Sequence, residues 1–286
     1  MAVKLSIVIP AYNEESRIGT SLHAVLDFVL RQPHAAEVIV VNDGSNDLTA
    51  DVVNSHVTEY KIAGVELRMI TNTPNRGKGY SVKSGVTEAR GEMVLFTDAD
   101  LSSPITEATK LMRPLEDGRA DIVFGSRALD RSLIAVRQPL ARDFGGRIFN
   151  LLMRLITGLP FKDTQCGFKA FRRRLALPAV QLQRIQGFGF DPELLYIARK
   201  QGLKLMEVPV VWSHSEGSRV SFLKDSLKMF ADLVLIRLND LRGRYSMPAS
   251  SVSMTGDNPA RDTADACDPT PLAAGIGANS REEDKA

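Results

Sequence analysis

The sequence predicts an α/β fold in which a mostly parallel sheet is flanked by helices. Short apolar runs alternate with longer segments of helical periodicity, an arrangement typical of βαβ units. The apolar runs contain few polar residues, as expected for parallel strands that are covered on both faces. With 286 residues, the chain is long enough for one large domain of this class.

Five apolar runs, rich in Val, Ile and Leu, are predicted to be strands. They lie at 5–9, 37–41, 65–70, 92–97 and 121–124. A further strand is predicted at 203–212. We expect Pro10 to stop the first strand, because proline cannot donate to the ladder.

The segments between these strands are predicted to be helices. In 14–31, for example, Ile18, Leu22, Val25 and Val29 would share one face. Further helices are expected from about 47 and at 77–89, 145–159, 191–202 and 222–241. The last of these is an amphipathic helix that would end a single folded domain.

The composition is that of a soluble globular protein, with 44% hydrophobic and 24% charged residues. Cys166 and Cys267 lack the spacing of a zinc site or a disulfide framework, which fits a reducing, cytoplasmic compartment. The sequence contains no uncharged apolar stretch of about 18 residues, so no transmembrane helix is predicted. The start, MAVKLSIVIPAYNEE, is too short and too strand-like for a signal peptide.

Residues 246–286 are predicted to be a disordered acidic tail behind a domain of residues 1–245. The tail holds three basic and seven acidic side chains and no aromatic residue, so it could bury little apolar surface. The other residues then hold 33 basic and 27 acidic side chains, a net charge of +6. A basic body favours an anionic partner such as a phosphate, a nucleic acid or a membrane surface.

The segment Asp98-Ala99-Asp100 follows the predicted strand at 92–97 directly. Ligands of open α/β sheets bind just beyond the carboxyl ends of the strands. If the backbone stays extended there, the two carboxylates point to the same side. Such oxygen ligands suit Mg²⁺ or Mn²⁺, and a metal-bound diphosphate of a nucleotide would be the natural occupant.

Polar residues also follow the other early strands, at 10–14, 43–45 and 125–127. Asn75-Arg76-Gly77-Lys78-Gly79 precedes a predicted helix, where the glycines let backbone N–H groups approach an anion and Lys78 adds a cation. This segment is neither a Walker A loop nor a dinucleotide fingerprint, since Val82 stands where the third glycine should be. Together, the strand ends predict one phosphate-binding site at this edge of the sheet.

Several segments, in this order, resemble glycosyltransferase family 2, whose members share the GT-A (Rossmann-like) fold. They are IVIPAYNEE at 7–15, VIVVNDGSNDLT at 38–49, NRGKGYSVKSG at 75–85 and LFTDADLSSP at 95–104. Within the family, DTQCGFKAF at 163–171 and FGFDPELLYIA at 188–198 resemble the dolichyl-phosphate β-glucosyltransferases more than their mannosyl relatives. The resemblance covers about residues 4–242. The chain departs from the family pattern in two respects. It shows no counterpart of the N-terminal membrane helix of the eukaryotic members, and its tail after Arg244 has no counterpart in the family.

The resemblance implies roles in binding the donor. Residues of the first two strand ends would hold uridine and ribose: Pro10, Tyr12, Glu14 and Asp43. Lys78 would neutralise the diphosphate, and Asp98 would also belong to the nucleotide-binding residues. Asp98 and Asp100 would be the ligands of Mg²⁺ or Mn²⁺.

It also implies an acceptor site and a sugar pocket. Arg127 and Arg142 would grip the acceptor phosphate, because a guanidinium offers planar, paired donors. The sugar pocket would be lined by Gln165, Cys166, Gly167 and Glu193. Asp191 and Glu193 stand where many members keep a catalytic carboxylate, which a hydroxyl acceptor needs and a lipid phosphate does not. Asp191 could equally be a helix N-cap before Pro192.

The resemblance therefore implies an inverting, metal-dependent glycosyltransferase that moves glucose from UDP-glucose to a polyprenyl (dolichyl-type) phosphate. Its catalytic residues would be Asp100, Lys78, Arg127 and Asp191. The alternatives are a GDP-mannose-dependent mannosyltransferase, an enzyme with a soluble acceptor, a nucleotidyltransferase of similar architecture and an inactive nucleotide-sugar sensor. The intact Asp98, Asp100 and Lys78 argue against the last of these.

Two basic amphipathic stretches, 148–162 and 222–237, bear on the partners of the chain. Such helices can lie in the plane of a membrane surface. The expected partners are a UDP-sugar, a polyprenyl phosphate and the cytoplasmic face of a membrane, and not a nucleic acid. The alternative is that these helices pack on the sheet or form a homo-oligomer.

Overall fold

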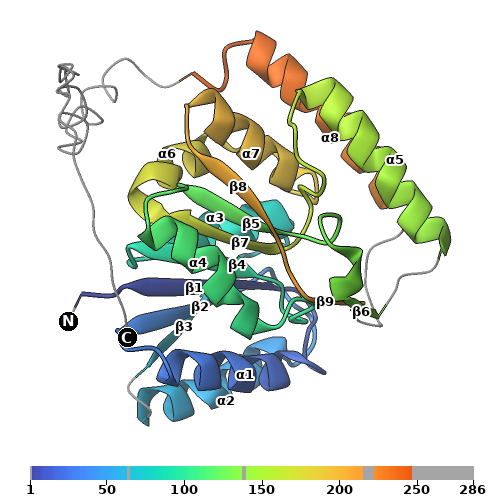
Figure 1. The fold of residues 1–286 in the computed structure, drawn as a ribbon. Helices are drawn as coiled ribbons and strands as arrows, with labels where there is room; N and C mark the ends of the chain where they lie inside the picture. The colour runs from blue at the N-terminus through green and yellow to red at the C-terminus, as the bar shows by residue number, and fades with distance from the viewer. Residues whose placement is uncertain (1, 63–64, 137–139, 215–221, 247–286) are drawn as a thin grey trace, which may run out of the picture. The chain divides into compact units, whose positions relative to one another are not determined.

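The computed structural model describes residues 2–62, 65–136, 140–214 and 222–246, although not the side chains of 140–144 and 222–226. Its centre is one sheet of seven strands in the order β3-β2-β1-β4-β7-β5-β8 (Figure 1). The strands are β1 (Leu5–Ala11), β2 (Ala36–Asn42), β3 (Glu66–Thr71), β4 (Met93–Thr97), β5 (Ile122–Ser126), β7 (Phe168–Arg172) and β8 (Leu205–Pro209). Only β7 runs antiparallel to its neighbours in this sheet, which confirms the mostly parallel α/β fold.

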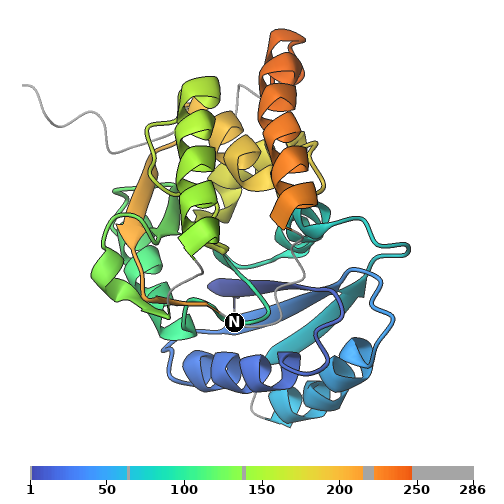
Figure 2. The same cartoon turned by 90° about the vertical axis from the view of Figure 1, so that its right-hand side faces the viewer.

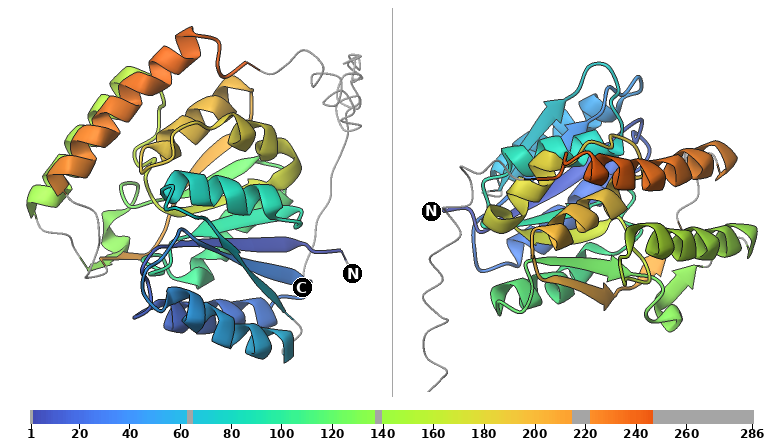
Figure 3. Two further views of the ribbon diagram at one scale, coloured as in Figure 1. Left: turned by 180° about the vertical axis from the view of Figure 1, so that it is seen from behind. Right: turned by 90° about the horizontal axis from the view of Figure 1, so that it is seen from above.

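Helices cover both faces of the sheet (Figure 2). One apolar core joins the sheet to α1 (Ile18–Leu30), α2 (Thr49–Ile62) and α4 (Ala108–Glu116). A second core joins its other face to α3 (Lys78–Glu88), α6 (Arg173–Leu182) and α7 (Phe190–Lys200). The long helices α5 (Leu140–Thr157) and α8 (Phe222–Leu241) pack against each other beyond α7 (Figure 3).

The remaining elements are short. They are the 3₁₀ turns η1 (Ile105–Glu107) and η2 (Arg131–Leu133) and a small parallel pair, β6 (Ile134–Val136) and β9 (Trp212–Ser213). The strand predicted at 203–212 is thus divided between β8 and β9. The helix predicted at 145–159 begins earlier, at Leu140, whereas the last helix has the expected bounds.

Pro10 does not stop the first strand, contrary to the prediction. β1 continues through Pro10 to Ala11, where it pairs with Val41 and Asn42 of β2. Its pairing with β4 has already ended at Val8. Because no β4 partner lies beside Pro10, the missing N–H costs no ladder bond on that side.

Apart from the short elements η1, η2 and β6, three elements were not predicted: α4, α6 and β7. Both helices contain a proline, Pro114 and Pro178, which disguised their periodicity. The strand β7 has the sequence FKAFR, whose charges interrupt the apolar run. It nevertheless inserts between β4 and β5, so its Lys169 enters the interior of the protein.

Candidate active site

The order of the strands places the candidate site at the carboxyl ends of β1 and β4. The chain builds β2 and β3 on one side of β1 and then crosses to β4 on the other side. In an open α/β sheet such a switch point leaves a crevice beyond the strand ends, where ligands bind. Tyr12, Asp43 and Asp98 follow β1, β2 and β4 at this edge.

The loops after β1 and β2 are locked together by hydrogen bonds. The Asn13 amide donates to Ser45 Oγ at 2.9 Å, and the Glu14 amide donates to Thr49 Oγ1 at 2.7 Å. The Glu14 carboxylate pairs with Arg17, and Pro10 is buried within β1. Of the residues predicted to hold uridine, Tyr12 is the most open to solvent, with 37% of its surface exposed.

Asp43 is buried and organises the loop before α3. Its Oδ1 accepts hydrogen bonds from Asn72 Nδ2 at 2.8 Å and from the Arg76 amide at 3.1 Å, and its Oδ2 accepts from the Gly77 amide at 2.7 Å. The carboxylate predicted to contact the nucleotide therefore also has a positioning role, because it fixes the glycine-rich segment. Its contact with uridine stays a prediction.

The glycines at the start of α3 are required by close packing. Gly77 has φ of 97°, and a Cβ there would lie 2.6 Å from the Gln186 carbonyl oxygen. A Cβ at Gly79 would lie 2.6 Å from Phe190 Cβ. The segment 185–190 thus lies against the first turn of α3, and larger residues would push Lys78 away from the strand ends.

Lys78 and Asp98 form the central ion pair of the site. Lys78 Nζ lies 2.6 Å from Asp98 Oδ1, and both side chains are partly exposed. Burial lowers the pKa of Lys78, but the carboxylates of Asp98, Asp191 and Asp100 outweigh it, so the pKa is raised above its ordinary value. Lys78 is therefore a charged ammonium at neutral pH, as the binding of a diphosphate requires.

The segment Asp98–Asp100 is a turn and not an extended strand, which corrects the reason given for its geometry. The Leu101 amide donates to the Asp98 carbonyl at 3.1 Å, and Leu101 has φ of 45°. The Ser102 amide donates to Asp100 Oδ1 at 2.9 Å. The buried Ser21 hydroxyl of α1 donates a hydrogen bond to the Ala99 carbonyl at 2.6 Å, so α1 supports this turn.

The Asp98 carboxylate occupies the space that a side chain at position 167 would fill. A Cβ at this position would lie 2.1 Å from Asp98 Oδ2 and 2.4 Å from Asp98 Cγ. The Asp98 amide also donates to the Gly167 carbonyl at 3.2 Å. The structure thus brings Gly167, predicted to line the sugar pocket, into direct contact with the predicted metal ligand.

A second buried ion pair lies beside the first. Lys169 of β7, with its side chain fully buried, contacts the Asp191 carboxylate and donates to the Cys166 carbonyl at 2.5 Å. Lys78 and Lys169 both lie over the ring of Phe96, at 5.6 and 5.5 Å from its centre. The N-cap prediction for Asp191 is wrong, because the cap position belongs to Gly189 and Asp191 lies in the first turn of α7.

Arg127 is held by a partner that sequence analysis missed. Its Nε and a terminal nitrogen donate to the two oxygens of buried Asp163 at 2.7 and 2.8 Å, and its amide donates to Oδ2 at 3.0 Å. The Arg127 side chain is 28% exposed, whereas that of Asp163 is almost fully buried. Arg142 lies in α5, but its side chain is outside the described residues. The role of both arginines in binding the acceptor stays a prediction.

Three further predicted pocket residues have different environments. Cys166 is buried, and burial raises the pKa of its thiol to about 11, so it is a neutral side chain. Gln165 reaches the Phe188 carbonyl at 3.4 Å. Glu193 is fully buried and binds the amides of Arg184 and Ile185 and the Tyr245 hydroxyl, so its carboxylate anchors the fold.

Asp163 and Lys169 are the functional residues that sequence analysis missed. Both lie within the DTQCGFKAF segment, but nothing in a single sequence pairs them with Arg127 and Asp191. A useful signal was available, since a lysine in the middle of an apolar strand needs a buried partner. Ion pairs of this kind indicate a preorganised charged centre.

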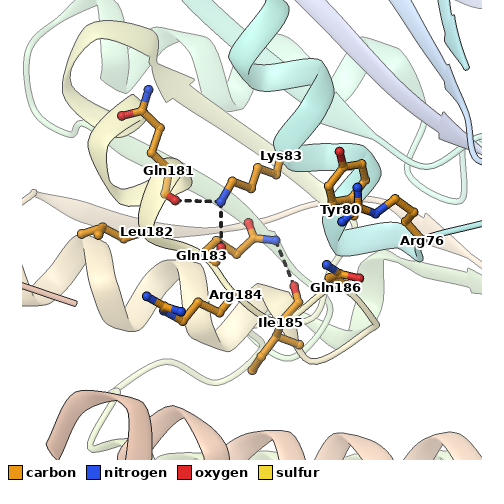
Figure 4. A pocket seen from close by; sticks show the side chains of 9 residues that line it. All are labelled: Arg76, Tyr80, Lys83, Gln181, Leu182, Gln183, Arg184, Ile185 and Gln186. Atoms are coloured by element: carbon orange, nitrogen blue, oxygen red, sulfur yellow. Dashed lines mark hydrogen bonds between the residues drawn. The ribbon is translucent and has the colours of Figure 1, made fainter. Parts of the chain in front are cut away.

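A cavity of about 430 Å³ lies beside α3, next to this centre (Figure 4). Its wall includes Arg76, stacked at 3.7 Å from the Tyr80 ring centre, and Lys83. Lys83 donates to the carbonyls of Gln181 and Gln183, at 2.7 and 2.8 Å, and burial lowers its pKa. Because none of the strand-end carboxylates lines this cavity, it is not the reaction centre.

The carboxylates of Asp98 and Asp100 fit a divalent cation. Both side chains are partly exposed at the strand end, and one oxygen of Asp100 is oriented by the Ser102 amide. Hard carboxylate oxygens are the ligands that Mg²⁺ and Mn²⁺ prefer, and such ions take one or two carboxylates together with phosphate oxygens. None of the helices in the described part of the chain is both long and apolar enough to cross a membrane.

Two relatives of known name are similar to most of this chain. The chain is 37% identical over 255 residues to the dolichyl-phosphate beta-glucosyltransferase of Mus musculus, across 85% of this chain and 78% of the relative. It is also 37% identical over 255 residues to such an enzyme of Trichomonas vaginalis, across 86% and 74%.

Solved structures show the same fold. Glucosyl-3-phosphoglycerate synthase from Mycobacterium tuberculosis, in complex with Mn²⁺, UDP-glucose and phosphoglyceric acid, superposes with a TM-score of 0.59 at 19% identity, covering 87% of this chain and 82% of that one. This likeness confirms the GT-A type of architecture. Residues 6–177 match the model of the family described as Glycosyl transferase family 2. The chain therefore belongs to glycosyl transferase family 2.

Proposed function

We propose that the protein transfers glucose from UDP-glucose to a polyprenyl (dolichyl-type) phosphate with inversion, giving lipid-phosphate β-glucose and UDP. The observation that carries this proposal is the paired charge centre of Lys78, Asp98, Lys169 and Asp191 at the switch point of the sheet. The 37% sequence identity to dolichyl-phosphate beta-glucosyltransferases, over most of both chains, supports the choice of sugar and acceptor.

The state of Asp191 supports a phosphate acceptor. A hydroxyl acceptor loses a proton as it attacks, so its enzyme needs a carboxylate with a free lone pair at the reacting oxygen. Here the Asp191 carboxylate is bound by the buried ammonium of Lys169. A phosphate oxygen is already an anion and can attack the sugar carbon directly, so Asp191 has no proton to accept and positions Lys169 instead.

Lys78 would carry the charge of the leaving group. As the bond between glucose and UDP breaks, negative charge grows on the diphosphate, and a cation fixed beside it lowers the barrier. Lys78 is held at the start of α3 and kept charged by three carboxylates. A divalent cation on Asp98 and Asp100 would add Lewis-acid stabilisation of the same diphosphate oxygens.

Arg127 is the proposed contact for the acceptor phosphate. Its bidentate pair with Asp163 fixes the guanidinium, which lies 5.5 Å from the ring centre of Trp212. The side chain remains partly exposed. Arg142, on α5, is proposed as the second contact. A rigid guanidinium loses little freedom when it binds phosphate, which favours this use of arginine.

The pair of helices α5 and α8 is the proposed membrane-facing surface (Figure 3). It exposes apolar side chains of α5 at Ile148, Leu151 and Leu155, and of α8 at Leu227, Phe230, Val234, Leu235, Leu238 and Leu241. Three of these, Leu155, Leu227 and Leu241, are more than 70% exposed. Exposed leucines beside basic residues such as Arg154 and Lys228 are typical of helices that bind anionic lipid reversibly.

The direct test is the product. The protein is incubated with UDP-glucose or GDP-mannose, Mg²⁺ or Mn²⁺ and polyprenyl phosphate, and the lipid is identified by mass spectrometry. We expect hexosyl lipid from UDP-glucose and its loss in Lys78→Met, while Lys110→Met, an exposed control, keeps activity. Product from GDP-mannose alone would assign a mannosyltransferase, and a product carrying nucleotide monophosphate would assign a nucleotidyltransferase.

Membrane attachment needs a separate test. Flotation with vesicles rich in anionic lipid should carry the protein upward at low salt and less so at high salt, because salt screens the basic side chains. Leu155→Ser together with Leu227→Ser should abolish flotation and leave the binding of UDP unchanged. A protein that never floats, yet glucosylates a water-soluble phosphate equally well, would contradict the membrane part of the proposal alone.

A further inference from the structure

Two histidines and a glutamate meet on the outer surface of α1 and α2, apart from the strand-end carboxylates. His23 belongs to α1, and His56 and Glu59, three residues apart, belong to α2. The ligand atoms that these side chains can offer all lie within 4.8 Å of one another. The side chains of His23 and Glu59 are 59% and 44% exposed, so the cluster is open to solvent.

The spacing of the two rings is that of metal ligands. His23 Nε2 and His56 Nε2 lie 3.3 Å apart, with the rings at 69° to each other. In a tetrahedral site with metal–nitrogen distances of about 2.0 Å, two nitrogen ligands are also about 3.3 Å apart. The pair therefore needs little rearrangement to bind one ion.

The backbone fixes the His56 ring in the form that binds metal. Its Nδ1 lies 2.8 Å from the Val52 carbonyl oxygen, which can only accept a hydrogen bond. Nδ1 must carry the proton in that bond, so the lone pair of the neutral ring lies on Nε2, the atom that faces His23. Metal-bound histidines are commonly oriented by such a bond from the other ring nitrogen to a carbonyl.

Glu59 adds a carboxylate oxygen and a negative charge within 4.8 Å of the histidine ligand atoms. Its Oε1 lies 3.4 Å from His23 Nδ1. A Cβ at Gly19 of α1 would lie 3.4 Å from Cε1 of the His56 ring, so this ring rests close to the α1 backbone. Two imidazoles and one carboxylate form a common ligand set for Zn²⁺, with a fourth position left for water.

We propose that His23, His56 and Glu59 form a binding site for Zn²⁺ or a similar divalent transition metal, separate from the carboxylates Asp98 and Asp100. Imidazole nitrogen favours Zn²⁺, whereas Mg²⁺ and Mn²⁺ favour the oxygen ligands of the strand end. The bound ion would join α1 to α2. Since Ser21 of α1 holds the Ala99 carbonyl, the ion would also stiffen the support of the Asp98–Asp100 turn.

In the test, a chelator first removes bound metal from the full chain. The chain is then titrated with Zn²⁺, and the heat of binding is measured by calorimetry. We expect one site per chain that persists in Asp100→Asn. Its affinity should fall at least about tenfold in His23→Ala and in His56→Ala, since each loses a ligand. His34→Ala, in the loop before β2, is the matched control and should bind like the unaltered chain. Co²⁺ bound in place of Zn²⁺ should show the intense visible absorption of tetrahedral coordination.

Thermal unfolding gives a second readout. Zn²⁺ at roughly a hundred times its Kd should raise Tm by about 5 °C or more, and the double variant His23→Ala, His56→Ala should lose this shift. The Tm of each variant without metal checks that the variant is folded. Zn²⁺ binding that is equal in the double variant, or weaker than about 1 mM in the unaltered chain, overturns the proposal. Neither result bears on glucosyl transfer.

Discussion

The contact between Gly167 and Asp98 leads to a sharp prediction for Gly167→Ala. The new Cβ would lie 2.1 Å from Asp98 Oδ2 and 2.4 Å from Asp98 Cγ, whereas ordinary contacts begin near 3.4 Å. Because the Asp98 amide is bonded to the Gly167 carbonyl, the two backbones cannot simply separate. The Asp98 carboxylate must therefore swing away by about 1 Å, out of its 2.6 Å contact with Lys78.

The expected result is a large loss of turnover with a modest loss of stability. A displacement of about 1 Å in a positioned group can cost about 10²-fold in rate. Overpacking at a partly exposed site costs about 1–3 kcal/mol of folding free energy, or a few degrees in Tm. Steady-state turnover of UDP-glucose and thermal unfolding, measured on the same samples, separate the two effects.

Two controls make this reasoning refutable. Gly146→Ala lies in α5, where an added Cβ meets nothing within 4 Å, and it should keep turnover and raise Tm slightly. If Gly167→Ala acts through Asp98, it should add little to the loss caused by Asp98→Asn. Turnover of Gly167→Ala within twofold of the unaltered chain, or additive losses in the double variant, would refute the proposed contact.

Four further predictions concern single side chains and the C-terminal tail. Asp100→Ala should lose most activity with an unchanged Tm, and full turnover of this variant in EDTA would contradict a metal role. Burial raises the pKa of Glu37, but the Ser6 hydroxyl, the Arg90 amide and Arg68 hold it below 4.5 overall. Its stabilising charge is thus present above pH 4.5 and lost as the pH falls through the lower folded pKa, so Glu37→Gln should melt earlier at pH 7 and decline less steeply in acid. Tyr245→Phe, which loses a 2.6 Å hydrogen bond to Glu193, should cost about 1–3 kcal/mol of folding free energy. A chain ending at Tyr245 should keep its turnover and Tm.

Much of the fold could be predicted because its central strands are buried on both faces. The apolar runs of β1, β2 and β4 satisfy that rule, and each is followed by turn residues. The strand β7 fails it, since Lys169 and Arg172 interrupt its run. Its place in the sheet depends on a charge pair with α7, which no local pattern contains.

Sequence analysis identified only those site residues that a local motif at a single strand end or helix start could reveal. Lys78 and Asp98 were identified from the glycine-rich segment and the Asp-Ala-Asp turn, and the structure pairs them. The partner of Arg127 lies 36 residues away, and that of Lys169 lies 22 residues away. The resemblance placed Glu193 in the sugar pocket. Residues two positions apart on a helix face different surroundings, and the Glu193 carboxylate accepts a hydrogen bond from the Tyr245 hydroxyl, away from the Asp191 pair.

The pairing of charges at this centre explains how it can be buried and still bind an anion. An isolated charge among Phe96, Phe190 and the sheet would cost several kcal/mol of desolvation, so each lysine is matched by an aspartate. The two pairs differ in one respect that matters for function. Lys169 and Asp191 are buried together, whereas Lys78 and Asp98 remain partly open to solvent. Under the proposed function, an arriving diphosphate would replace Asp98 as the partner of Lys78 without exposing a charge to the apolar interior, while the buried Lys169–Asp191 pair would stay intact.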